Sequence, residues 1–269
     1  MKSAAVIGSN GFIGSVIVKK LLDQNISVFA IYNKDVDRID PRAKIVTNEQ
    51  FLSLSVAPDI IFFVIGNYNT PYKGLLDINQ MLYRYVKNFP ESRLIYVSSA
   101  NVYGNSTNII TEESPFINPG TYAMSKLSGE FIVQSLNNYS IIRLAYVFGP
   151  EMTNNSFIPT LIKSGRNEGK ITLFGKGARE QDYIYVDDAV DLCIAAGISS
   201  ANEIYLGATG KSTSNLEVAQ HIKRYMNCDI IFKGEDTAPS YYFDPSETFS
   251  KLNWAPSVSI EEGIKNMLT

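Results

Sequence analysis

Short apolar segments alternate with amphipathic helical segments through the first half of the chain. A strand that is apolar on both faces must be covered on both, as in a parallel sheet flanked by helices. Because crossovers between parallel strands are right-handed, the pattern predicts a doubly wound, Rossmann-like α/β sheet. The expected strands are residues 4–7, 27–32, 43–46, 60–65, 94–97 and 139–144, with helices starting near residue 12 and covering 75–89 and 122–136.

The pattern changes after Gly149 and Pro150. Elements become shorter and glycines more frequent, although helical patterns continue at 188–196, 216–226 and 260–268. Ser214 and Glu217 form a capping-box pattern before the second of these. We therefore expect a dinucleotide-binding domain over residues 1–150. Residues 151–269 would form a smaller α/β lobe, mainly for substrate, that shares its core with the first domain.

Charge and composition exclude several classes of partner. The net charge is −3, without a block of like charges, so no basic stripe for nucleic acid is present. The apolar runs are too short to cross a bilayer, and the chain opens directly into a strand-like segment. We expect a cytoplasmic protein without a membrane partner. Cys193 and Cys228 have no metal-site spacing, so we expect buried, reduced thiols and no bound metal.

A glycine turn connects the first expected strand to the first expected helix. The turn contains Gly8, Gly11 and Gly14, with Asn10 between the first two glycines. Phe12 and Ile13 follow at the start of the expected helix. Glycines allow a tight turn and a close approach of the backbone to a pyrophosphate, and the helix N-terminus offers free N–H groups. The alternative is a purely structural turn. The position directly after a strand and before a helix favours dinucleotide binding.

The end of the second strand bears on the choice between NAD and NADP. A site that prefers NAD usually places a carboxylate there for the ribose hydroxyls. This chain has Asn33 and Lys34 at that point, with Arg38 further on. Lys34 and Arg38 could hold a 2′-phosphate, or both could be solvated loop residues. The pattern gives a weak preference for NADP.

A phenol and an ammonium group follow each other by one helical turn in Tyr122-Ala-Met-Ser-Lys126. A tyrosine has an ordinary pKa near 10, and a nearby cation stabilises the phenolate. The tyrosine could then exchange a proton with a sugar oxygen while hydride moves to or from a nicotinamide. Ser98 and Ser99 end the fifth strand, where one of them could hydrogen-bond the same oxygen. Capping of the strand end is the alternative for the other.

In this order, the motifs GxxGxxG, VSSANVYG, YAMSK, RLAYVFGP and DYIYVDDA resemble the NAD(P)-dependent epimerase/dehydratase family of extended short-chain dehydrogenases. The resemblance covers essentially the whole chain. It implies that Ser99, Tyr122 and Lys126 are catalytic and that Asn79 lies near the nicotinamide ribose, with a solvated helix residue as the alternative for Asn79. Gly66 stands where the fourth strand would meet the cofactor, and a close approach of the backbone explains a small residue there. Together with the glycine turn, the cofactor residues expected are Gly8, Asn10, Gly11, Phe12, Ile13, Gly14, Asn33, Lys34, Gly66, Asn79, Tyr122 and Lys126.

Departures from the family pattern bear on the reaction. Dehydratases of the family have an Asp-Glu pair where this chain has Ala100 and Asn101, so dehydration is disfavoured. The phosphate-binding arginine of the family is Gln181 here, and Arg179 could take its place or be solvated. The family pattern places the substrate against Asn101, Tyr146, Asn155, Phe157, Phe174 and Arg179, with loop and core packing roles as the alternatives for Asn155 and Phe174.

The resemblance implies an enzyme that oxidises and reduces a ring carbon of a nucleotide-linked sugar. A 4-epimerase and a 4-ketoreductase are almost equally favoured. The alternatives are a non-catalytic protein that senses dinucleotides with the same fold, and a sugar-nucleotide dehydratase. Members of the family often pair through the helices that correspond to 75–89 and 122–136, which implies a homodimer.

Overall fold

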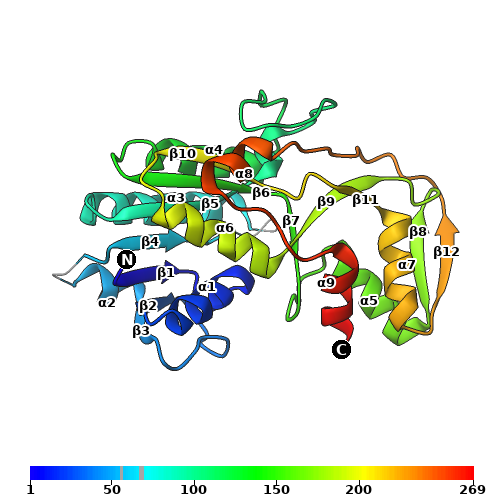
Figure 1. Cartoon of the computed structure of the whole chain (residues 1–269), viewed down its shortest axis with the longest axis horizontal. Helices are drawn as coiled ribbons and strands as arrows, with labels where there is room; N and C mark the ends of the chain where they lie inside the picture. Colours follow the sequence, from blue (N-terminus) through cyan, green and yellow to red (C-terminus); the bar gives the residue numbers. More distant parts are fainter. Residues whose placement is uncertain (55–56, 67–69) are drawn as a thin grey trace.

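Seven parallel strands form the central sheet of the computed structural model, which describes residues 1–54, 57–66 and 70–269 (Figure 1). Their order is β10-β6-β5-β4-β1-β2-β3. The six strands predicted from the sequence are all present, which confirms the Rossmann-like α/β class. The strands are β1 (Ser3–Ile7), β2 (Ser27–Tyr32), β3 (Lys44–Thr47), β4 (Ile60–Phe63), β5 (Arg93–Ser99), β6 (Tyr139–Leu144) and β10 (Glu203–Gly207).

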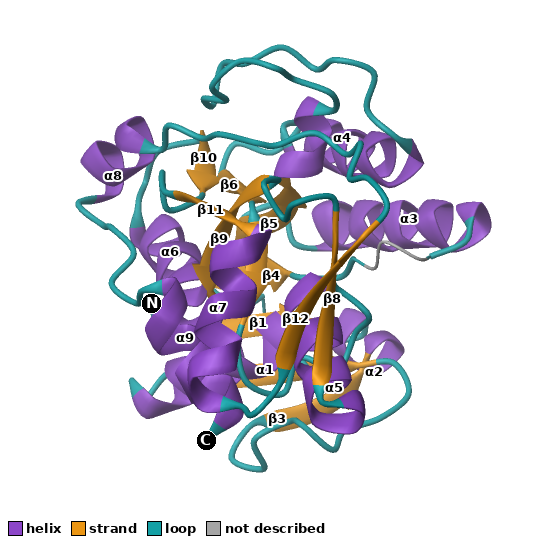
Figure 2. Cartoon of the chain, turned by 90° about the vertical axis from the view of Figure 1, so that its right-hand side faces the viewer, coloured by secondary structure: helices purple, strands orange, loops and turns teal. Residues whose placement is uncertain are grey.

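Helices cover both faces of this sheet, because successive side chains of each strand point to opposite faces. In β1, Ala4 and Val6 join the buried cluster that contains α1 (Phe12–Asp23) and α6 (Val186–Ile198). Ala5 and Ile7 join the other cluster, against α3 (Tyr72–Asn88) and α4 (Thr121–Val133). Figure 2 shows α3 and α4 beside each other on one side of the sheet. The short helix α2 (Asn48–Leu52) follows β3.

The second lobe lies beside the carboxyl ends of the central strands (Figure 1). Two elements that follow residue 150, α6 and β10, belong to the layers of the central sheet instead. The remaining elements of the lobe are β7 (Tyr146–Phe148), β9 (Glu180–Tyr185) and β11 (Ser212–Ser214) in one sheet, β8 (Lys170–Phe174) and β12 (Asp229–Lys233) in another, and the helices α5 (Phe157–Glu168), α7 (Asn215–Tyr225) and α9 (Ile260–Leu268).

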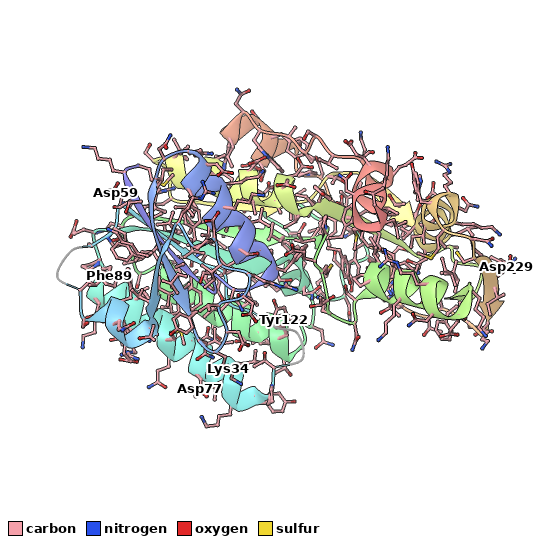
Figure 3. All side chains as sticks on the ribbon, turned by 90° about the horizontal axis from the view of Figure 1, so that it is seen from below. Lys34, Asp59, Asp77, Phe89, Tyr122 and Asp229 are labelled. Atoms are coloured by element: carbon pink, nitrogen blue, oxygen red, sulfur yellow. The ribbon has the colours of Figure 1, made fainter. Side chains whose placement is uncertain are left out.

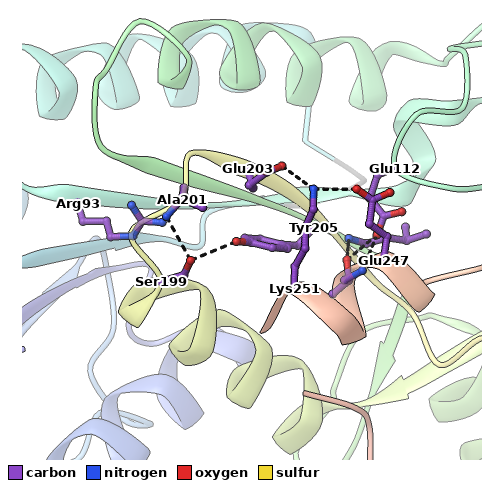
Figure 4. Close-up of polar contacts among 10 residues, drawn as sticks. Arg93, Glu112, Ser199, Ala201, Glu203, Tyr205, Glu247 and Lys251 are labelled. Carbon is purple, nitrogen blue, oxygen red and sulfur yellow. Dashed lines mark hydrogen bonds and ion pairs between the residues drawn. The ribbon is translucent and has the colours of Figure 1, made fainter. Parts of the chain in front are cut away.

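The edge strand β10 was not predicted from the sequence. Ion pairs and hydrogen bonds connect this strand and the residues before it to neighbouring elements (Figure 4). Lys251 of α8 (Ser246–Leu252) forms ion pairs with Glu203 at 2.9 Å and with Glu247 at 2.7 Å. At the opposite side, the buried guanidinium of Arg93 donates to the carbonyl oxygen of Ala201 at 2.7 Å. These contacts join α8 to β10 and join Arg93 of β5 to the segment before β10.

Local signals in the sequence explain two further features. The capping box of α7 is formed, with the Ser214 side chain accepting from the Glu217 N–H and the Glu217 side chain accepting from the Ser214 N–H. Cys193 and Cys228 are free and buried, as predicted. Among the described residues, no helix combines the length and the apolar character needed to cross a membrane.

Candidate active site

The glycine turn leaves no space for side chains. Gly8 has a φ of +91°, and its carbonyl oxygen accepts from the Gly11 N–H at 2.9 Å. A Cβ on Gly14 would lie 2.1 Å from that same oxygen, so only glycine fits. Helix α1 starts at Phe12 without a side-chain cap, which leaves the N–H groups of its first turn, including that of Ile13, available to an anion.

A cavity of about 560 Å³ extends from this turn along the ends of β1, β2 and β4. The cavity has the place and size that a dinucleotide needs, and its glycines form a cradle that Cβ atoms would fill. The residues present therefore fit the cofactor. The structure brings together the following residues that the sequence predicted for the cofactor: Gly8, Asn10, Gly11, Asn33, Lys34 and Gly66.

Tyr122 and Lys126 lie one turn apart on α4, at the inner end of this cavity. A Cβ on Gly66 would lie 2.7 Å from the Lys126 Nζ and 3.2 Å from the Tyr122 hydroxyl, so both groups converge on this glycine. The Lys126 Nζ donates to the carbonyl oxygens of Ile65 at 2.9 Å and Val97 at 2.8 Å. Burial lowers the pKa of Lys126 to about 8, although the Glu130 carboxylate counteracts part of this effect. At neutral pH the side chain therefore remains mostly a cation.

The two serines at the end of β5 have different partners. The buried Ser98 hydroxyl donates to the Glu130 carboxylate at 2.5 Å. Glu130 also forms a buried ion pair with Arg143 at 2.7 Å. The Ser99 side chain accepts from the Asn101 N–H at 3.2 Å and lines a cavity, so its own O–H can donate to a ligand. Of the two, Ser99 is the one whose hydroxyl faces a cavity.

Asn79 lies behind the catalytic helix. Its side-chain Nδ2 donates to the carbonyl oxygen of Ser125, the residue before Lys126, at 3.0 Å. Its Oδ1 is buried and has no hydrogen-bond partner among the described residues. The role of Asn79 beside a cofactor ribose stays a prediction.

Two cavities adjoin Tyr122 and Ser99 on the side of the second lobe. One is lined by Ser99, Asn101 and Tyr146, which the sequence singled out. The other, of about 500 Å³, contains Asn101 and Tyr122. Tyr241 lines both cavities, and sequence reasoning missed it. The only local signal was an aromatic cluster at residues 241–243, and its proximity to Ser99 depends on a distant strand-like pairing.

The structure places the remaining substrate candidates farther along the second lobe. Asn155 lines a separate cavity beside α5, and Phe157 is the first residue of that helix, packed against the core. Phe174 ends β8 with 60% of its surface exposed. The Arg179 Nε donates to the Pro239 carbonyl oxygen at 3.0 Å. Their roles in substrate binding stay predictions.

Figure 3 shows where Tyr122 lies in the molecule. Seen from below, Tyr122 lies where the central sheet meets the second lobe, on the same side as Lys34, whereas Asp229 lies at the far end of the lobe. A molecule that reaches from Lys34 to Tyr122 would therefore leave its reacting end facing the second lobe.

The sequence is similar to known proteins over nearly its full length. A protein of Methanocaldococcus jannaschii, provisionally assigned as a UDP-glucose 4-epimerase, is 28% identical, and the match covers 98% of this chain and 96% of that protein. The structure resembles UDP-glucose 4-epimerase of Thermotoga maritima with UDP-glucose (TM-score 0.85, 23% identity, 99% and 97% of the two chains covered). It also resembles UDP-glucuronic acid 4-epimerase of Bacillus cereus in complex with UDP-glucuronic acid and NAD (TM-score 0.84, 20% identity, 99% and 98% covered).

The sequence pattern of one family matches residues 4–205, which include the glycine turn, Ser99, Tyr122 and Lys126. The match covers well over half of the chain, and it spans both the cavity beside the glycine turn and the helix α4. The chain belongs to the NAD dependent epimerase/dehydratase family.

Proposed function

We propose that this protein is an enzyme that oxidises and reduces a ring carbon of a nucleotide-sugar, as a 4-epimerase or a 4-ketoreductase. The observation that carries this proposal is the convergence of the Tyr122 hydroxyl and the Lys126 ammonium on Gly66. This point lies at the inner end of the cavity that starts at the glycine turn. The full-length similarity to a protein assigned as a UDP-glucose 4-epimerase supports the choice of substrate.

In the proposed reaction, a bound nicotinamide supplies the acceptor and donor of hydride. The Tyr122 phenolate removes the proton of the sugar hydroxyl that becomes a ketone, and returns it when the ketone is reduced. The Lys126 ammonium, 6.0 Å from the centre of the Tyr122 ring, stabilises the phenolate. The Ser99 hydroxyl donates to the same sugar oxygen and steadies its developing charge.

Dehydration and a sensing role are the alternatives. A dehydratase needs a further acid and base beside the sugar, and Ala100 and Asn101 cannot transfer protons. A sensor of dinucleotides needs none of the three groups Ser99, Tyr122 and Lys126. The presence of all three beside a second set of cavities favours catalysis.

The test uses wild-type protein and Tyr122→Phe with a panel of UDP-, GDP- and dTDP-sugars. Wild-type protein should convert at least one of them, and Tyr122→Phe should lose at least about 100-fold of that rate, since one acid–base group contributes 10²–10⁴-fold. Consumption of NADH or NADPH indicates the reductase, and product without net consumption indicates the epimerase. An undiminished rate in Tyr122→Phe would refute the mechanism.

The preference for NADP depends on Lys34. The Arg38 guanidinium donates to the Glu151 carbonyl oxygen at 2.9 Å, so of the two cations Lys34 is the one that lines the cofactor cavity. We propose that Lys34 holds the 2′-phosphate of NADP. Lys34→Ala should then weaken the binding of NADPH about tenfold and leave NADH unchanged in a fluorescence titration. Equal effects on both cofactors would contradict this assignment.

We also propose a homodimer formed through α3 and α4. Apolar side chains of these helices are exposed on the face away from the sheet, Tyr72 and Phe131 with 72% and 77% of their surfaces. Burial of such a stripe is favourable in proportion to its apolar area. Light scattering at micromolar concentration should give the mass of two chains, and Phe131→Glu should give one. The stripe contains Tyr72, Leu76, Tyr83, Met124 and Phe131.

A further inference from the structure

The walls that face the catalytic tyrosine are uncharged. The two cavities beside Ser99 and Tyr122 are lined by hydroxyl, amide, aromatic and aliphatic side chains. None of their described lining residues is Lys, Arg, His, Asp or Glu. The side-chain amides in these walls come from Asn101, Asn105 and Asn118.

These amides are available to a ligand. The side chains of Asn105 and Asn118 are exposed and form no hydrogen bond with the rest of the described chain. An amide can donate to one hydroxyl and accept from another, which suits the neighbouring hydroxyls of a sugar. Tyr241, which lines both cavities, offers an apolar ring face to the C–H groups of a sugar.

Two charged groups close to these walls already have partners. Lys126 lies behind Tyr122, and its Nζ already donates to two carbonyl oxygens. The segment that carries Tyr241 is bound to Glu180, whose carboxylate accepts from the Tyr242 hydroxyl. The carboxylate of a sugar acid bound in these cavities would therefore lose its hydration and meet no cation in the walls.

We propose that the sugar that reacts at Tyr122 is uncharged, a hexose or N-acetylhexosamine, and that the enzyme rejects the corresponding uronate. This inference rests on the proposed function and narrows its substrate. It separates this chain from the structural neighbour that binds UDP-glucuronic acid, although the two share a fold.

The experiment compares nucleotide-sugars that differ only at C6, such as UDP-glucose and UDP-glucuronate, with the nucleotide that the enzyme accepts. The expected kcat/KM is at least about 100-fold lower for the uronate, because it leaves a desolvated charge without a partner. A smaller difference overturns the inference while the proposed function stands. Absence of turnover with every nucleotide-sugar of the panel refutes the proposed function, and the inference with it.

A matched pair of variants tests the cause. Asn105→Lys places a cation in the wall and should reduce the preference for UDP-glucose over UDP-glucuronate at least tenfold. Asn227→Lys adds the same charge at an exposed position between α7 and β12, and should leave this preference unchanged. Equal responses of the two variants would show that the charge of the wall does not set the specificity.

Discussion

The buried ion pair between Glu130 and Arg143 gives the sharpest test of how the catalytic helix is held. Both side chains have only 4% of their surfaces exposed. The Arg143 guanidinium donates to both Glu130 oxygens, at 3.2 and 2.7 Å, and to the Tyr103 hydroxyl and the Glu112 carbonyl oxygen at 3.0 and 3.1 Å. Arg143→Met keeps most of the volume and removes all four contacts.

The expected loss of stability in Arg143→Met depends on the contacts that Glu130 retains. Glu130 would keep one hydrogen-bond partner, the Ser98 hydroxyl, and its buried charge would lose the guanidinium that pairs with it. Removing one member of a buried pair costs about 3–5 kcal/mol, which is a large part of the 5–15 kcal/mol by which a typical domain is stable. In the double variant Glu130→Leu/Arg143→Met no charge remains. Most of the lost stability should therefore return.

Urea unfolding, followed by circular dichroism and by the fluorescence of Trp254, measures these differences. Arg84→Met is the matched control, because Arg84 pairs with Glu49 at 2.8 Å on the surface, where ion pairs contribute little. The reasoning is refuted if Arg143→Met is no less stable than Arg84→Met. It is also refuted if the double variant is as unstable as Arg143→Met.

Three further predictions follow from single contacts. Burial lowers the pKa of Lys126 to about 8, so the side chain loses its positive charge as the pH rises through 8. In a pH–rate profile, kcat/KM should therefore fall above pH 8. Lys126→Arg should move this fall to higher pH. Gly66→Ala places a Cβ 2.7 Å from the Lys126 Nζ, so kcat should fall about 100-fold while the melting temperature changes little. The two Asp182 carboxylate oxygens accept from Thr209 N–H and Gly210 N–H, one each, at 2.8 Å, so Asp182→Asn turns an amide NH2 towards one of these donors and should cost about 1–3 kcal/mol in a thermal melt.

The sequence predicted the central sheet well, because its strands are apolar on both faces. It also predicted Tyr122 and Lys126, since their spacing on a helix is a local property. The edge strand β10 was missed because its first two residues, Glu203 and Ile204, are half-exposed, so the apolar run that marks a buried strand is incomplete.

The missed parts of the site depend on contacts between distant residues. Tyr241 reaches the cavities because its neighbour Phe243 pairs with Ile110, more than a hundred residues earlier in the chain. Arg38 was expected as a cofactor residue or a solvated one, and instead binds the backbone at Glu151 across the two lobes. No periodicity within either segment contains this information, since the partner lies in another element.

Ser98 and Ser99 have the same side chain but different surroundings, because the register of β5 places them on opposite faces of the sheet. Side chains of a strand alternate between faces, so Ser98 points with Tyr96 towards α4, and Ser99 points away from it. In the β5–β6 register Ser98 lies opposite Arg143, and both reach Glu130 from the same face. A shift of one residue would move Ser99 towards the ion pair and remove its hydroxyl from the cavity. The Ser98–Glu130–Arg143 contacts therefore stabilise the register that places the Ser99 side chain in the wall of the cavity.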